Sequence, residues 1–96
     1  MPEVIPRHHY PRFGLRTLAV YETEDGLSAP VGPVEDKVLQ RFLATADSKA
    51  QMAAHFGYSE KHVKNTMSRL LAKFRVENRT QLYRVASRAR RISRPS

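Results

Sequence analysis

The chain contains no cysteine among its 96 residues. Without cysteine it has no disulfides, no CxxC redox centre and no thiolate ligands for zinc. A domain of this size must then fold by burying apolar side chains alone, which suits a helical bundle in a reducing compartment. No apolar run approaches the roughly 18 residues that cross a membrane, and the first residues lack the long apolar stretch of a secretory signal. We therefore expect a cytoplasmic protein with no membrane partner.

Acidic residues are scarce in the second half of the chain. Residues 1–47 carry five basic and seven acidic side chains, a net charge of −2, whereas residues 48–96 carry twelve basic side chains and two acidic ones, a net charge of +10. Positive charge this concentrated indicates a polyanionic partner for the second half. A solubilising surface or a disordered basic tail has the same composition, so the pattern of the charges must decide between these interpretations.

Signatures of catalysis and of cofactor binding are missing as well. The chain has no P-loop, no GxSxG and no GxGxxG sequence. Its histidines are divided between a proline-rich loop (His8, His9) and two different predicted helices (His55, His62), and no Asp or Glu cluster completes a metal shell beside them. The sequence therefore predicts no enzyme activity, no metal, no cofactor and no small-molecule substrate.

The first 30 residues predict mostly irregular structure. Prolines interrupt residues 1–12, and the β-prone stretch 13–22 alternates too poorly for more than one short strand. We therefore expect a leader or arm over residues 1–30, a helical domain over residues 31–92 and a frayed basic tail over residues 93–96. The role of the leader stays open between a disordered segment, a dimerisation strand, an arm that reaches DNA and a dock for another protein.

Four helices are predicted from apolar stripes and capping residues, and the expected fold class is all-α. The predicted ranges are 33–46, 49–56, 60–74 and a fourth helix that follows Asn78, with its apolar stripe reaching Ala89 and extended as far as Ile92 in its longest form. Gly57 suits the left-handed end of the second helix, and Ser59 suits the cap of the third. A helix, a glycine turn and a capped helix in this order are typical of a helix-turn-helix.

The predicted helix 60–74 has one apolar side and one basic side. The apolar stripe consists of Val63, Met67, Leu70, Leu71 and Phe74. The other faces carry Lys61, Lys64, Asn65, Ser68, Arg69 and Lys73. A helix that is merely solvated usually mixes charges of both signs, but no acidic residue follows Glu60 here. A membrane-surface helix would place bulky aromatic residues beside the basic face. The pattern therefore favours a helix that recognises nucleic acid.

Residues 31–86 resemble the LuxR/NarL-type (GerE) helix-turn-helix domain of bacterial transcription regulators. The segments that carry the resemblance are Pro33-Val34-Glu35 at the opening helix, residues 52–59 at the scaffold helix and turn, Val63-Lys64 and residues 70–74 in the recognition helix, and residues 76–80 at the entry to the last helix. The chain departs from the family in three places. The glycine after the first helix is absent, His62 replaces a usual threonine, and Thr66 replaces a common histidine.

The resemblance implies a four-helix, sequence-specific DNA-binding transcription regulator that acts on double-stranded DNA as a homodimer. The helix 60–74 would enter the major groove, and the family's base-reading positions correspond to Lys64, Asn65 and Ser68. An amide such as that of Asn65 can pair with adenine, and a lysine can donate to guanine. Phosphate contacts are expected from Lys49, Ser59, Lys61, Arg69, Lys73 and Arg79. The fourth helix would form the dimer interface through Leu82, Tyr83, Val85, Ala86 and Ala89. The alternative is packing within one chain, and we expect Leu82 and either Val85 or Ala86 to serve both purposes.

Two alternatives remain open at this stage. The first is a module similar to sigma-factor region 4, which shares this helical plan and acts through RNA polymerase. The second is a protein-interaction module that sequesters another regulator and uses its basic surface to bind an acidic partner. The salt dependence of duplex binding separates DNA binding from the second alternative, because phosphate contacts release counterions.

Overall fold

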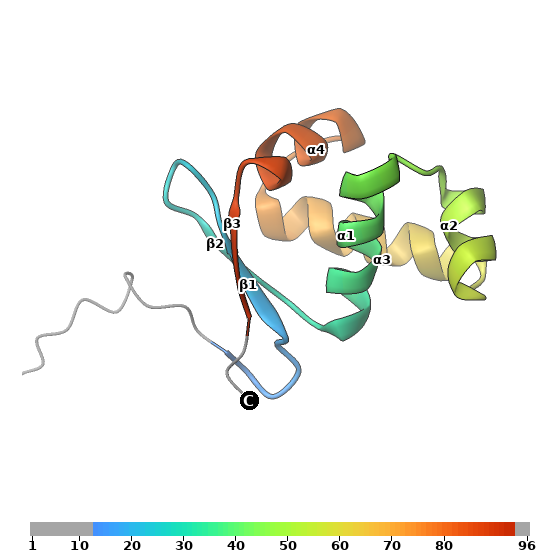
Figure 1. The fold of residues 1–96 in the computed structure, drawn as a ribbon, viewed down its shortest axis with the longest axis horizontal. Coiled ribbons are helices and arrows are strands. Elements are labelled where there is room, and N and C mark those ends of the chain that lie inside the picture. The colour runs from blue at the N-terminus through green and yellow to red at the C-terminus, as the bar shows by residue number, and fades with distance from the viewer. Residues whose placement is uncertain (1–12, 94–96) are drawn as a thin grey trace, which may run out of the picture.

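The computed structural model of the protein describes residues 13–93 (Figure 1). The four helices are α1 (Pro33–Thr45), α2 (Lys49–Phe56), α3 (Glu60–Phe74) and α4 (Arg79–Ser87). The three strands are β1 (Ala19–Glu22), β2 (Ser28–Val31) and β3 (Arg90–Ser93). The predicted positions of all four helices are therefore confirmed, with small shifts at their ends. Residues 1–12 of the expected leader and residues 94–96 of the expected tail lie outside the described residues.

The strands form an antiparallel sheet in the order β2-β1-β3, which the sequence did not predict. The expectation of at most one short strand before the first helix was wrong, because β1 and β2 pair as a hairpin. β1 does not alternate, since Ala19, Val20 and Tyr21 are all buried. Pro30 in β2 is unfavourable for a strand in general, but it is tolerated here because β2 is an edge strand of the sheet.

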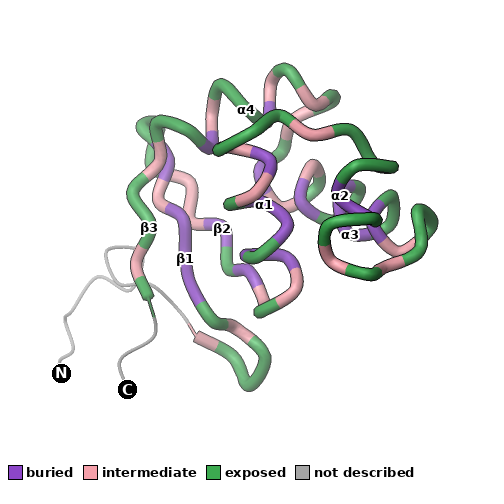
Figure 2. Tube along the Cα trace, turned by 45° about the vertical axis from the view of Figure 1, so that its right-hand side comes forward, coloured by how far each residue is buried: buried purple, intermediate pink, exposed green. Residues whose placement is uncertain are grey.

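The predicted extension of the fourth helix was also wrong. α4 ends at Ser87, and the chain then reverses so that Ile92 lies opposite Val20 on the far side of β1 from β2. Ile92 fits the helical spacing of the stripe equally well, so the local pattern could not separate the two outcomes. The strand forms because β1, about 70 residues earlier in the chain, presents a free edge. Figure 2 shows β1 buried between its neighbours and β3 at the exposed margin.

The helix ends follow the predicted capping residues. Ser59 Oγ accepts a hydrogen bond from the His62 N–H (3.0 Å), and Asn78 Oδ1 accepts one from the Gln81 N–H (2.9 Å). Gly57 ends α2 with a φ of 74°, in the left-handed region that glycine favours. Ala46 ends α1 with a φ of 56°, at the point where the glycine of the resembled family is missing. The backbone therefore keeps the left-handed turn without the glycine.

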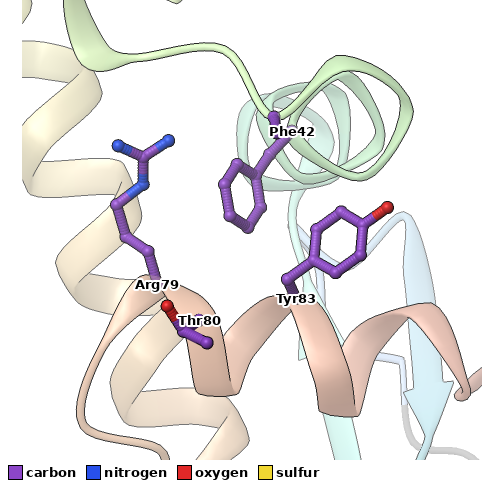
Figure 3. Close-up of a pocket in the computed structure, with 5 residues that line it drawn as sticks. Phe42, Arg79, Thr80 and Tyr83 are labelled. Carbon is purple, nitrogen blue, oxygen red and sulfur yellow. The ribbon is translucent and has the colours of Figure 1, made fainter.

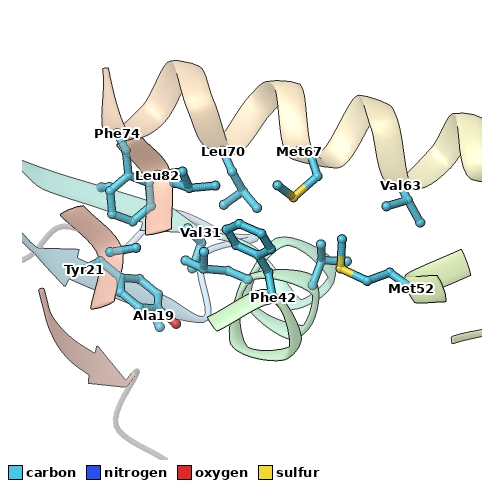
Figure 4. Close-up of a cluster of buried hydrophobic side chains, with 14 of the residues drawn as sticks. Ala19, Tyr21, Val31, Phe42, Met52, Val63, Met67, Leu70, Phe74 and Leu82 are labelled. Carbon is cyan, nitrogen blue, oxygen red and sulfur yellow. The ribbon is translucent and has the colours of Figure 1, made fainter. Parts of the chain in front are cut away.

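The core lies between the sheet and the helices, and α3 crosses it. Figure 4 shows Val63, Met67, Leu70 and Phe74 of α3 pointing toward Phe42 and the other apolar side chains below the helix. The ring of Phe74 also meets that of Tyr21 on β1 edge to face, with 5.7 Å between the centroids. Because its apolar stripe is held on both α1 and the sheet, α3 presents its opposite side to solvent in a fixed orientation.

Candidate nucleic-acid interface

The exposed side of α3 carries the polar residues that the sequence singled out. Lys61, Lys64, Asn65 and Ser68 are all exposed, whereas Val63, Met67 and Leu70 between them are buried. Helical spacing of about 100° per residue separates the two sets. Within residues 13–93, none of these four exposed side chains has an ion pair or a hydrogen bond to another side chain. Their donors are therefore available to a ligand.

Two further predicted phosphate contacts lie at the beginnings of helices. Lys49 is the first residue of α2 and is exposed. Ser59 is the exposed cap of α3, where its oxygen accepts from the His62 N–H. The Ser59 hydroxyl hydrogen remains available to an acceptor such as a phosphate oxygen. The N-terminus of α3 also bears a partial positive charge from the helix dipole.

Arg69 and Lys73 are held by a carboxylate of α1. Arg69 Nε lies 3.2 Å from Glu35 Oε2, and Lys73 Nζ donates to Glu35 Oε1. The arginine side chain is still 52% exposed and the lysine side chain 34% exposed. These two cations therefore fix α3 against α1 and keep part of their surface open to solvent. The interaction had no signal in the sequence, because Glu35 lies more than thirty residues before its partners.

Glu35 is expected to make the fold sensitive to acid. Burial alone would raise its pKa, but hydrogen bonds from Lys73 and the Gly32 N–H outweigh burial and hold the pKa below its usual value. A carboxylate with a lowered folded-state pKa stabilises the protein above its unfolded pKa of about 4.3, and this stabilisation is lost as the pH falls through the folded pKa. Between about pH 5 and 3, we expect the melting temperature to fall more steeply for the wild type than for Glu35→Gln. Parallel profiles would contradict this role of Glu35.

A match to a protein family covers this part of the chain. Residues 33–86 match the family described as bacterial regulatory proteins, luxR family (GerE), a span of more than half of the chain. The chain belongs to the LuxR family. This result confirms the resemblance seen in the sequence, and it makes the helix-turn-helix a DNA-binding domain of the kind used in transcription regulation. Comparisons with curated proteins and with solved structures gave no match.

The LuxR-family match begins at the first residue of α1 and ends within α4. The three strands therefore lie outside it, on both sides. The sheet is joined to the matched helices by Asp36, whose carboxylate accepts hydrogen bonds from Tyr21 on β1 (2.8 Å) and from Arg91 on β3 (2.7 and 2.9 Å). The sequence contains no local signal for this connection, because Tyr21 and Arg91 lie 15 and 55 residues from Asp36 in the chain.

Arg79 of the LuxR-family domain serves a packing role in the structure. Its guanidinium donates to the Asp47 carbonyl oxygen (2.5 Å) and lies 4.9 Å from the centroid of the Phe42 ring. These contacts fix the start of α4 against the α1–α2 connection. Figure 3 shows the arginine beside a groove of about 510 Å³ between α1 and α4, lined by Phe42, Ala46, Arg79, Thr80 and Tyr83. The phosphate contact expected of Arg79 stays a prediction.

The five predicted dimer residues differ in how far they are accessible. Leu82 and Ala86 are buried in the core of the single chain, and Val85 and Ala89 are half-buried against it. Tyr83 is 42% exposed, and its ring meets that of Phe42 edge to face at the groove. Of these five residues, Tyr83 is thus the one that exposes a large aromatic surface to solvent.

Residues 13–93 contain neither a candidate metal cluster nor a helix that could span a membrane. Within this range, no group of three or more His, Cys, Asp or Glu side chains is arranged to hold a metal ion. None of the helices in the same range is both long enough and apolar enough to cross a membrane.

Proposed function

We propose that the chain is a sequence-specific transcription regulator that inserts α3 into the major groove of double-stranded DNA. The observation that carries the proposal is the set of four exposed polar side chains on α3 that have no ion pair and no hydrogen bond to another side chain within the described residues: Lys61, Lys64, Asn65 and Ser68. An α-helix fits the major groove, where base edges present donors and acceptors. The core holds the other side of α3 rigidly, so the basic side can enter the groove without rearrangement.

The predicted site residues on α3 and at the starts of α2 and α3 have two kinds of proposed task. Asn65 pairs with adenine through its amide, Lys64 donates to guanine, and Ser68 contacts a third base edge. Lys61, Ser59 and Lys49 bind phosphates and set the register of the helix in the groove. Arg69 and Lys73 bind phosphates through the part of each side chain that Glu35 leaves exposed. Because Glu35 already orders these two side chains, binding costs them less conformational entropy.

The active species is proposed to be a homodimer that acts in the cytoplasm on two half-sites. Tyr83 on α4 supports this proposal, since it is exposed beside an aromatic groove. A two-fold dimer through α4 would place the same residues of both copies opposite each other. Two copies of α3 would then read two related half-sites at a fixed spacing.

Selection of bound duplexes from a random pool tests this function. The purified chain alone should enrich one sequence, present as two related half-sites. Enrichment of a single half-site would contradict the homodimer, and a requirement for RNA polymerase would favour the alternative that resembles sigma-factor region 4. The logarithm of the binding constant should fall linearly with the logarithm of salt concentration. The slope of this line, called the salt slope, should become steeper by about 0.9 for each phosphate contact. Binding without enrichment or salt dependence would overturn the proposal and favour an acidic protein partner.

A further inference from the structure

Lys37 of α1 contacts the turn that precedes α3, and the proposed function gives this lysine no role so far. Lys37 is exposed, and its Nζ donates a hydrogen bond to the Tyr58 hydroxyl (3.1 Å). Tyr58 lies in the turn between α2 and α3, directly before the Ser59 cap. The side chain therefore reaches from the first helix to the turn that precedes α3.

Aromatic rings hold the Lys37 ammonium in this place. It lies 5.7 Å from the centroid of the Tyr58 ring and 5.8 Å from that of the Phe56 ring. These two rings stack at 5.5 Å, and His62 on the first turn of α3 meets the Tyr58 ring edge to face at 4.6 Å. The position of the charge is thus fixed relative to the N-terminal end of α3.

The ammonium is fixed but not neutralised. Over residues 13–93, Lys37 has no ion pair with a carboxylate. An ammonium has three donors, and the Tyr58 hydroxyl accepts one of them. Two donors therefore remain for an external anion.

Lys37 also lies near an edge of α3 that a DNA phosphate backbone could follow. His62, Arg69 and Lys73 occupy one edge of the helix by their spacing, next to the exposed side and facing the start of α1. Lys37 reaches this edge through Tyr58, whose ring contacts His62, whereas Arg69 and Lys73 further along the same edge pair with Glu35 of α1. The three cations Lys37, Arg69 and Lys73 outnumber the single Glu35 carboxylate, so they form a rim of net positive charge along one edge of the side that is proposed to enter the groove. One phosphate backbone of the duplex would follow such a rim.

We propose that Lys37 is a phosphate-binding residue that extends the DNA interface from the helix-turn-helix to α1, with Tyr58 as its positioning residue. The inference rests on the proposed function, since it assumes that α3 enters the major groove. The contact sets the register of the domain on the duplex and carries no base preference.

The salt dependence of binding tests the inference on a duplex selected by the unmodified 96-residue chain. Lys37→Met should reduce the steepness of the salt dependence by about 0.9, the value of one phosphate contact, and leave the selected sequence unchanged. Lys37→Arg should retain the wild-type slope. Tyr58→Phe keeps the ring and removes the hydroxyl, so it should weaken binding less than Lys37→Met while the slope stays unchanged. Arg88→Met, which removes an exposed charge after α4, is the matched control with no expected change of slope.

Phosphate ethylation interference supplies a second readout. Ethylation of one phosphate in each half-site should weaken binding by the wild type, and ethylation of the same phosphate should have no effect on binding by Lys37→Met.

A lower melting temperature of Lys37→Met with an unchanged salt slope would overturn the inference and show that Lys37 has a purely structural role. Lys61→Met separates this failure from that of the proposed function. If Lys61→Met alters the slope and Lys37→Met does not, only the role of Lys37 is wrong; if neither alters it, the entry of α3 into DNA is wrong as well.

Discussion

Replacing Arg91 by methionine should lower the free energy of unfolding by about 3 kcal/mol or more. Arg91 Nη2 and Nε donate to the two oxygens of Asp36, whose side chain is only 3% exposed. Burial alone would raise the pKa of Asp36, but hydrogen bonds from Arg91 and Tyr21 hold it below its usual value, so the group is a carboxylate in the folded protein. Without the guanidinium, that carboxylate would remain buried without a counter-ion.

Urea-induced unfolding, followed by circular dichroism, measures this effect. Arg90→Met is a matched control, because Arg90 pairs with Glu22 through a side chain that is 75% exposed. Exposed pairs contribute about 0–1 kcal/mol, so the control should be close to wild type. Asp36→Asn combined with Arg91→Met should recover part of the loss, since no buried charge is then left unpaired. Equal destabilisation by the two arginine variants would show that Asp36 does not anchor β3.

The sheet shows where reasoning from the sequence fails in this fold. The helices could be predicted because their signals are local: an apolar stripe such as that of α3, the capping residues Ser59 and Asn78, and Gly57 at a helix end. The strands have only four residues each, too few to establish a period. Their stability comes from partners that are distant in the chain, such as Val20 and Ile92. No local pattern contains that information.

The same division applies to the candidate interface. The exposed positions of Lys64, Asn65 and Ser68 follow from helical periodicity, and the structure places them as expected. The periodicity could not show that Glu35 binds two of the cations of α3, because helix packing brings them together. The family resemblance assigned one stripe of α4 to the dimer. Packing within the single chain buries Leu82 and Ala86 of that stripe and half-buries Val85 and Ala89, so Tyr83 is the exposed one of the five predicted residues.

The double substitution Lys64→Ala and Asn65→Ala should remove the sequence preference of the protein. Each side chain is proposed to make a bidentate contact to one base, and such a contact contributes about 1–3 kcal/mol of discrimination. The ratio of specific to non-specific affinity should therefore fall by roughly 30-fold or more. Competition between a selected and a scrambled duplex at one salt concentration measures this ratio.

Stability separates loss of recognition from loss of folding in this experiment. Both side chains are exposed, and within residues 13–93 neither has an ion pair or a hydrogen bond to another side chain, so the urea midpoint of the double variant should match that of the wild type. Arg84→Ala combined with Arg88→Ala is the control, because it removes two exposed charges from the region of α4 and should leave the preference intact. A double variant that folds normally and still prefers the selected duplex would show that another face of the molecule reads the bases. The exposed side of α3 would then serve only for electrostatic attraction to the phosphates.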